Sequence, residues 1–386
     1  MMSEASPFAP ITGTKGGSDD LDGRCEAPSQ FLETNTGGIE LPSRRSTRTA
    51  WRAFPLSLFT CVMGLASTGL AWREAGKVLS AAAVVGELIL ATAALVYVGL
   101  SAALGLRITY DRVGLAAELR HENEAPFAAS VAIATMLIAS ALGPYAPLLS
   151  HGLWLCAVVV HLCVNALLVG QWLTGGYPGG PTPAWFIPLA GAVLAPVAGI
   201  PLGYWDLCWS IFGISIILWL MLTSVMLQRA ASTQALAEAH WPSFAILVAP
   251  PAVGCLGYLE LNQGVADAFA RSLYAISAFF ILVLIGIAHR LARQPFGMIW
   301  WSYTYPLSAF ALASNKMSGR LRNLADVYLP EIAIALASGV VAIVIIRTLK
   351  LLSSPYSFRQ LGWPEVIRLP AGVRLTRRIR RQRICR

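Results

Sequence analysis

Charged residues are scarce in this sequence. Asp, Glu, Lys and Arg make up only 13% of its 386 residues, whereas soluble domains carry about 25%. Hydrophobic residues make up 56%, and the two proportions together exclude a soluble domain. The net charge of +9 would suit a nucleic-acid-binding protein, but the basic residues stand between and after apolar spans instead of on one compact domain. We therefore expect no nucleic-acid partner.

The sequence also lacks the residue patterns that carry common enzyme chemistry. It has seven cysteines but no CxxC pair and no Cys/His spacing typical of a metal site. No Walker loop or nucleophile triad stands out. Five cysteines fall in apolar stretches, where cysteine behaves as a small apolar residue: Cys61, Cys156, Cys163, Cys208 and Cys255. We expect no enzyme, no metal ion and no cofactor.

What the sequence has instead is a series of apolar segments, each near the ~20 residues that a helix needs to cross a membrane. Ten can be counted, at about 52–72, 79–104, 126–147, 149–173, 184–204, 206–228, 242–262, 266–290, 297–318 and 326–350. Their short connections predict antiparallel helical hairpins. Residues 51–352 should therefore form one ten-helix transmembrane domain. Residues 1–50, which lack the apolar core of a signal peptide, should be a disordered tail, and residues 353–386 a basic tail.

Lys and Arg residues predict the orientation, because short cytoplasmic loops are enriched in them. If the N-terminus is cytoplasmic, the loops on that side hold Arg107, Arg112, Arg120, Arg229, Arg290 and Arg293. The opposite side holds Arg73, Lys77, Arg271, Lys316, Arg320 and Arg322. Both termini are therefore predicted to be cytoplasmic, with the domain in the inner (plasma) membrane. The arginine-rich run at 374–386 is expected to lie on anionic membrane lipids.

Proline is distributed unevenly among the ten segments. Pro188, Pro196, Pro250, Pro251 and Pro306 lie well inside the fifth, seventh and ninth. A proline in the middle of a helix kinks it, and the freed carbonyl then needs a protein or cavity neighbour. The pattern predicts two shells, with kinked odd-numbered helices around a central pore and straighter even-numbered helices facing lipid. Chance, together with the general enrichment of proline in membrane helices, is the alternative.

The ninth segment carries the principal pore candidates. Tyr303, Thr304 and Tyr305 come just before Pro306. We predict that this helix lines the pore and that Tyr305 projects into the pore as a gate. Tyr303, Thr304 and Pro306 are expected to lie beside it. The alternative is that Tyr305 packs between helices with its hydroxyl bonded to a neighbour. Further candidates for the pore lining are Pro196, Pro250, Pro251, Thr60 and Thr135.

The odd-numbered segments hold hydroxyls but almost no carboxylates at membrane depth. Cation pores typically use rings of Asp or Glu, so hydroxyls, helix dipoles and basic mouths favour a weakly held anion. For any single hydroxyl, a bond to its own helix is the commoner alternative. Glu87, in the second segment, is either a proton site for coupled transport or a paired carboxyl at a helix interface. His161 and Asn165 lie one turn apart and are predicted to be interhelical hydrogen-bond partners.

Four stretches in the same order carry a family resemblance. They are FPLSLFTCVMGLASTGLAW at 54–72, GYWDLCWSIFG at 203–213, PSFAILVAPPAVGCLGYLELNQG at 242–264 and WWSYTYPLSAFALAS at 300–314. Over residues 52–350 the chain resembles the family of bacterial TehA and the plant guard-cell slow anion channel, also called the tellurite-resistance/dicarboxylate transporter family. The resemblance implies ten helices as five hairpins around a central pore, a homotrimer, and a phenylalanine plug on the ninth helix. Aligned on Trp301, Tyr305 takes the place of that phenylalanine, and a shifted alignment would put Tyr303 there.

Two classes of function follow from these observations. The first is a gated channel that passively conducts small monovalent anions selected by pore size; small inorganic or organic anions are the expected partners in either class. The second is a proton-coupled exporter of a C4-dicarboxylate, sulfite or a tellurium oxyanion, which needs a titrating group in its path, and Glu87 is the candidate. A structural or sensor membrane protein is a third reading, but it would give the kinked odd-numbered helices no purpose.

Overall fold

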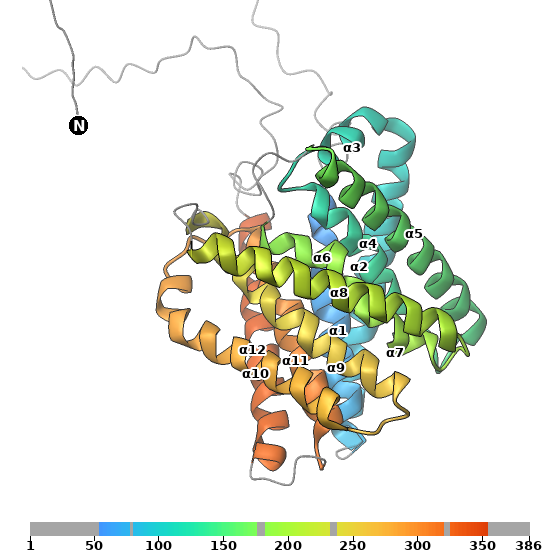
Figure 1. Ribbon diagram of the computed structural model, residues 1–386, viewed down its shortest axis with the longest axis vertical. Helices are drawn as coiled ribbons and strands as arrows, with labels where there is room; N and C mark the ends of the chain where they lie inside the picture. Colours follow the sequence, from blue (N-terminus) through green and yellow to red (C-terminus); the bar gives the residue numbers. More distant parts are fainter. Residues whose placement is uncertain (1–53, 78–79, 176–181, 232–237, 320–324, 354–386) are drawn as a thin grey trace, which may run out of the picture. The chain divides into compact units, whose positions relative to one another are not determined.

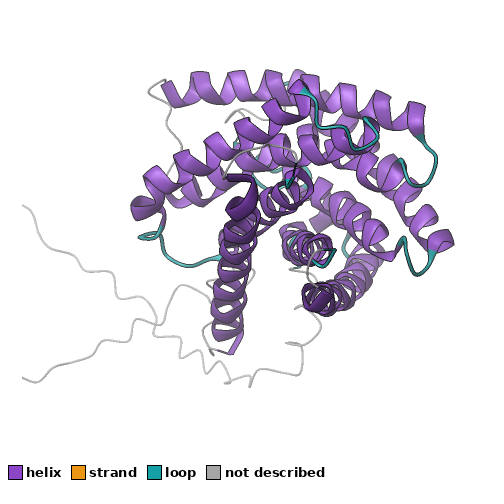
Figure 2. Cartoon of the chain, turned by 90° about the horizontal axis from the view of Figure 1, so that it is seen from below, coloured by secondary structure: helices purple, strands orange, loops and turns teal. Residues whose placement is uncertain are grey.

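Helices account for all the regular secondary structure in the residues that the structure describes. The computed structural model describes residues 54–77, 80–175, 182–231, 238–319 and 325–353 (Figure 1). These residues contain no strand, and Figure 2 shows helices joined only by loops. They all lie in one compact unit, residues 46–386. The predictions for residues 1–50 and 354–386 lie outside the described part of the chain.

Five long helices expose large apolar side chains. They are α2 (Ser80–Tyr110), α5 (Pro147–Leu173), α8 (Trp205–Ala231), α10 (Ala268–Leu291) and α12 (Ala325–Ser353). Leu88, Leu148 and Ile285 are examples of exposed apolar residues on them. A helix that presents leucine and isoleucine outward in this way suits a lipid surrounding, where those side chains lose nothing by exposure.

Within the described residues, seven helices are long and apolar enough to cross a membrane. The predicted fifth segment is represented by a shorter apolar helix, Pro183–Gly199. In the first and ninth segments the α-helical parts, α1 (Phe59–Ala75) and α11 (Thr304–Met317), have 17 and 14 residues, fewer than the ~20 that a span needs. Short 3₁₀ helices precede them. The all-helical membrane fold is thus confirmed, with seven spans recognisable by length and composition.

A second set of helices is buried inside the unit. It consists of α1, α4 (Ala128–Leu142), α6 (Phe186–Ala190), α7 (Ala195–Gly199), α9 (Ala249–Leu261) and α11. The apolar windows of the helices that contain α4 and α9 are 78% buried, whereas those of the five long exposed helices are at most 33% buried. These buried segments contact one another in the order α1, α4, α6–α7, α9, α11 and back to α1. The exposed helices α2, α5, α8, α10 and α12 each pack on the buried segment that precedes them in the chain (Figure 1).

The buried segments change from 3₁₀ to α-helix partway along. Before α6, α7, α9 and α11 come η4 (Pro183–Trp185), η5 (Gly191–Leu194), η6 (Glu238–Val248) and η7 (Met298–Tyr303). Pro188, Pro196, Pro250, Pro251 and Pro306 each stand second or third in the α-helix that follows.

This placement corrects the expectation of a kink in the middle of a continuous helix. The first backbone N–H groups of an α-helix have no intrahelical acceptor, so a proline there removes no helical hydrogen bond. The prolines therefore mark junctions where a 3₁₀ helix gives way to an α-helix.

Small residues let the buried segments approach closely. A Cβ atom on Gly64 of α1 would lie 2.1 Å from Oγ1 of Thr304 on α11, and one on Gly257 of α9 would lie 2.3 Å from the carbonyl oxygen of Val193 on η5. Neither position can carry a larger side chain without separating the backbones. Close contact through glycine and threonine is the usual way in which membrane helices pack.

A buried ion pair at the start of α1 joins this bundle to a helix that the sequence did not predict, α3 (Arg112–Glu118). Glu118 pairs with Arg107 of α2, and its second oxygen accepts the N–H of Leu56 at 2.8 Å. The carbonyl of Leu56 in turn accepts the hydroxyl of Ser130 on α4 at 3.2 Å. These bonds fix the end of the bundle at which α1 begins.

Candidate functional site: the central cavity

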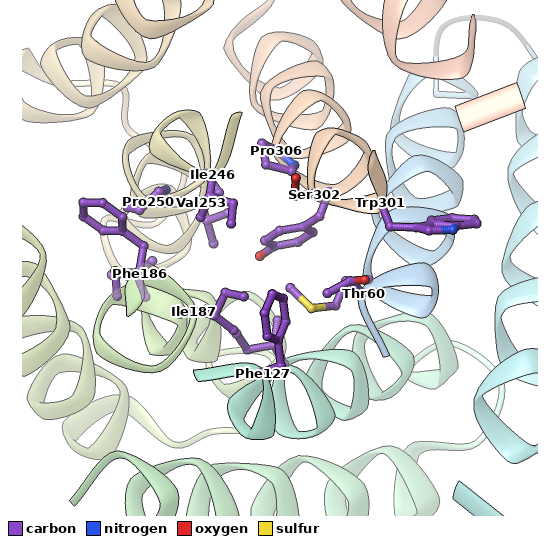
Figure 3. Close-up of a pocket in the computed structure, with 17 residues that line it drawn as sticks. Thr60, Phe127, Phe186, Ile187, Ile246, Pro250, Val253, Trp301, Ser302 and Pro306 are labelled. Atoms are coloured by element: carbon purple, nitrogen blue, oxygen red, sulfur yellow. The ribbon is translucent and has the colours of Figure 1, made fainter. Parts of the chain in front are cut away.

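A small cavity lies where the buried segments meet near their 3₁₀/α junctions (Figure 3). Its volume is about 40 Å³, enough for a few water molecules. It is lined from α1, from η3 (Ala125–Phe127) and α4, from α6 and η5, from η6 and α9, and from η7 and α11. Its lining includes Thr60, Met63, Phe127, Phe186, Ile187, Ile246, Pro250, Val253, Trp301, Ser302, Tyr305 and Pro306.

The lining is almost entirely apolar. Figure 3 shows Phe127 and Ile187 on one side of the cavity, facing Ile246 and Val253 from η6 and α9. Among the described residues that line it, none carries a charge. An apolar constriction of this kind is a barrier to an ion that needs its hydration shell.

Tyr305 contributes a full aromatic ring to this lining. It is the second residue of α11, and only 8% of its surface is exposed. Its hydroxyl makes no hydrogen bond to another residue in the described part of the chain, and the residue lines the cavity. Tyr305 also belongs to the buried apolar core of the unit, so the gate and the packing tyrosine both stay predictions.

The other two hydroxyls of the lining are already bonded to carbonyl oxygens. Thr60 donates to the carbonyl of Ser57 at 2.6 Å. Ser302 is placed to donate to the carbonyls of Ile299 at 2.6 Å and Pro242 at 3.1 Å. Of the lining hydroxyls in the described residues, that of Tyr305 is therefore the one without an internal acceptor.

The structure brings four of the predicted site residues together at the cavity: Tyr305, Pro306, Pro250 and Thr60. Pro196 and Pro251 are buried in α7 and α9 but do not belong to the lining.

The two remaining threonines make structural hydrogen bonds outside the lining. Thr304 donates to the carbonyl of Trp301 at 2.7 Å. Thr135 donates to the carbonyl of Val131 at 2.7 Å, and its oxygen lies 2.9 Å from the hydroxyl of Tyr97. Both threonines follow the alternative in which a hydroxyl bonds to its own helix segment.

Tyr303 lies at a different cavity. It lines a groove between α10 and α12, on the outer side of α11. Its hydroxyl is buried and, within the described residues, has no hydrogen-bond partner. Tyr303 and Tyr305 therefore do not face the same space.

Glu87 forms an ion pair near the end of α1. Its two carboxylate oxygens accept from Nε and Nη2 of Arg73 at 2.6 and 2.8 Å. Arg73 also donates to the carbonyl of Ala141 at 3.0 Å, and its guanidinium lies over the ring of Tyr145. Glu87 does not belong to the lining of the cavity.

The prediction for His161 and Asn165 is confirmed. His161 Nε2 and Asn165 Nδ2 each lie 3.0 Å from the carbonyl oxygen of Pro188. α6 ends at Ala190, two residues later, and gives way to η5. The two side chains thus hold α5 against the junction in the neighbouring segment.

Reasoning from sequence missed the apolar part of the lining, because Phe127, Ile187 and Ile246 look like any other apolar residue of an apolar segment. One signal could have found some of them. Phe127 follows Pro126, and Ile187 precedes Pro188, just as Tyr305 precedes Pro306. A residue beside a junction proline is thus a candidate for the lining, as these three are.

Comparison with known proteins identifies the family of the chain. The model of the voltage-dependent anion channel family matches residues 53–349. The S-type anion channel SLAH2 of Arabidopsis thaliana is 24% identical over 309 residues, which are 77% of this chain and 58% of the relative. The tellurite resistance protein TehA homolog of Haemophilus influenzae is 25% identical over 260 residues, which are 67% of this chain and 79% of the relative.

The guard cell S-type anion channel SLAC1 of Arabidopsis thaliana is 20% identical over 275 residues, which are 68% of this chain and 49% of the relative. The chain therefore spans only about half the length of the plant relatives. The family match itself covers well over half of the chain, and the resemblance read from the sequence is confirmed. This multi-pass membrane protein is not an enzyme and belongs to the voltage-dependent anion channel family.

Proposed function

We propose that the chain lets small anions cross the membrane through the central cavity, which is a closed point on a pore. In this proposal the five buried segments form the wall of the pore. The five exposed helices each return beside one of them, so that ten crossings make five hairpins. The ring of contacts from α1 through α4, α6–α7, α9 and α11 back to α1 supports this arrangement. The homotrimer implied by the family resemblance belongs to the same proposal, as does the placement of both termini in the cytoplasm.

Tyr305 is the gate in this proposal. The observation that carries it is an aromatic ring in the lining whose hydroxyl makes no hydrogen bond to another residue in the described part of the chain. A ring held only by apolar contacts can swing aside without breaking a hydrogen bond. Such a gate closes the pore sterically and by excluding the water that an ion needs.

In this proposal, selectivity for anions rests on the helix dipoles of α9 and α11 and on the lack of negative side chains in the described lining of the cavity. The first turns of α9 and α11 line the cavity, and these helices have 13 and 14 residues. The N-terminal end of a helix carries a partial positive charge, which stabilises an anion nearby. In the described lining there is no carboxylate to oppose it, and the hydroxyl of Tyr305 is placed to donate to a passing anion.

The geometry favours passive passage over proton-coupled export. A coupled exporter needs a titrating group in the path, and Glu87 is instead paired with Arg73 away from the cavity. The name of the bacterial relative, a tellurite resistance protein, keeps tellurium oxyanions among the anions to be tested, together with chloride, nitrate, sulfite and C4-dicarboxylates.

The test is anion flux into liposomes that contain the purified protein, measured with and without a pH gradient. Because the gate is shut at rest, wild type and Tyr305→Ala are compared side by side, with empty liposomes as the control. We expect Tyr305→Ala to carry chloride or nitrate down its own gradient at equal pH on both sides. Flux that appears only when a pH gradient is imposed would overturn the channel and establish the proton-coupled exporter.

A further inference from the structure

An apolar groove lies on the lipid-exposed side of α11, between α10 and α12. Its volume is about 250 Å³. It runs along α10 from Ile281 to Leu291 and on to Ala292, which follows the helix, and along α12 from Leu336 to Val344. At about 1.5 Å of rise per residue, the α10 wall is about 16 Å long, close to half of the ~30 Å hydrocarbon thickness. The groove therefore has the length of one leaflet.

One end of the groove carries positive charge. Arg347 follows Val344 by three residues, and its guanidinium lies 5.2 Å from the ring centre of Trp300 and 5.9 Å from that of Phe296. Within the described residues, no carboxylate pairs with Arg347. Arg290 and Lys350 stand in the last turns of α10 and α12. Cations of both helices thus gather where the groove reaches the end of the bundle.

The floor of the groove contains a polar group. The hydroxyl of Tyr303 is buried there and lacks a hydrogen-bond partner in the described part of the chain. This hydroxyl lies beneath the surface of the groove, so the lining that a ligand meets is apolar. Trp300, whose indole nitrogen donates to the carbonyl of Pro295 at 3.1 Å, forms the wall between this hydroxyl and Arg347.

We propose that this groove binds an anionic phospholipid, with one acyl chain between α10 and α12 and its phosphate at Arg347. The groups along the groove match those along such a lipid. The apolar wall, as long as one leaflet, would contact the acyl chain, and the cation of Arg347 at its end would contact the anionic phosphate. The unpaired guanidinium selects a negative headgroup, because a neutral lipid leaves it without a full countercharge. The lipid belongs to the leaflet on the side of Arg290 and Arg347, which is the cytoplasmic leaflet if the proposed orientation holds. The site does not depend on the proposed pore, because it lies on the opposite side of α11.

Quenching of Trp300 fluorescence by brominated acyl chains tests the proposal. Purified wild-type protein is titrated with brominated phosphatidylglycerol or brominated phosphatidylcholine in detergent micelles, and the signal of Trp300 is taken as the difference from Trp300→Phe. We expect an apparent affinity about fivefold higher for phosphatidylglycerol, the factor that one basic group near an anionic headgroup supplies. Arg347→Gln should abolish this preference and keep the quenching by phosphatidylcholine.

Two matched variants separate the groove from general effects. Arg112→Gln removes an exposed arginine at the start of α3, away from the groove, and should keep the preference for phosphatidylglycerol. Val340→Phe fills the groove and should weaken quenching of Trp300 by both lipids. Equal affinity for the two lipids in wild type, or unchanged quenching in Val340→Phe, would overturn the proposal. So would a disulfide between two chains that each carry Val340→Cys, because a second copy would then cover the groove.

Discussion

Replacing Tyr305 by alanine is the most direct test of the gate. In the structure Tyr305 lines a cavity of about 40 Å³, and its hydroxyl makes no hydrogen bond to another residue in the described part of the chain. The substitution therefore removes a barrier and breaks no hydrogen bond. It should open the pore while leaving the bundle folded.

The size of the effect follows from what a releasable gate requires. Turning the ring off its rotamer costs about 0.5–1.5 kcal/mol. An allosteric effector typically supplies about 1–3 kcal/mol, which is a factor of about 5–150 in an equilibrium. A gate that can be released must be held shut by a free energy in this range. Basal anion flux through Tyr305→Ala should therefore rise about 5- to 150-fold over wild type.

The stability of the variant should fall only modestly. Truncating a fully packed aromatic residue to alanine costs about 3–5 kcal/mol. The ring of Tyr305 already borders empty space, so the loss should lie at or below the lower end of that range. Tyr305→Phe should conduct as little as wild type and be as stable, because no hydrogen bond is lost.

Tyr274 provides a matched control. It is also a buried tyrosine, but it stacks on Phe310 and its hydroxyl donates to Ser314 at 3.0 Å. Tyr274→Ala should lower the thermal midpoint and leave basal flux unchanged, and Tyr274→Phe should cost the ~0.5–1.5 kcal/mol of one hydrogen bond. Chloride or nitrate flux in liposomes and thermal unfolding in detergent are measured for all four variants. A folded Tyr305→Ala that conducts no more than wild type would refute the gate.

Three further predictions concern residues away from the cavity. Glu87→Gln should keep anion flux and its pH response, and should lower the free energy of unfolding by about 1 kcal/mol or less, as for a partly exposed ion pair. Loss of proton coupling in this variant would favour the exporter. Asp267 accepts a hydrogen bond from the hydroxyl of Tyr258 and caps α10, and these bonds lower its pKa. The stabilisation by its carboxylate is therefore present at neutral pH and is lost as the pH falls below about 4. The difference in thermal midpoint between wild type and Asp267→Ala should shrink below that pH, and a difference that stays constant would contradict this. A reporter active only in the cytoplasm should work after Arg293 and Arg386 and fail near Arg271, and the reverse pattern would invert the proposed orientation.

Long apolar runs make the exposed helices the most predictable part of the fold. α5 and α10 each continue for 24 residues or more without a break, so hydropathy finds them at once. α3 is only seven residues long and has no such signal. Burial of its last residue, Glu118, depends on Arg107 and on the backbone of Leu56, and no local sequence window contains all three.

The 3₁₀/α junctions are harder to predict than the helices. A run such as residues 242–262 stays apolar through both η6 and α9, so hydropathy cannot show where one geometry gives way to the other. Pro250 and Pro251 do indicate a break, but a proline is compatible with a kinked helix as well as with a new first turn. The choice depends on whether the preceding residues find partners in 3₁₀ geometry, which is a property of the packed bundle.

The orientation of Tyr305 shows the consequence of this uncertainty for the site. Side chains two residues apart point in directions that differ by about 200° around the axis of an α-helix, and by more in a 3₁₀ helix. Only one of Tyr303 and Tyr305 can therefore face the centre of the bundle. Both are tyrosines, and both stand just before Pro306, so composition does not distinguish them. The phase is set by contacts of η7 with other segments: Trp301 donates to Thr348 of α12 at 3.1 Å, and Ser302 to the carbonyl of Pro242 in η6 at 3.1 Å. These bonds hold the last turn of η7 so that Tyr303 faces the outer groove and Tyr305 faces the cavity. The same short segment thus joins the proposed gate to the proposed lipid site, with one tyrosine at each.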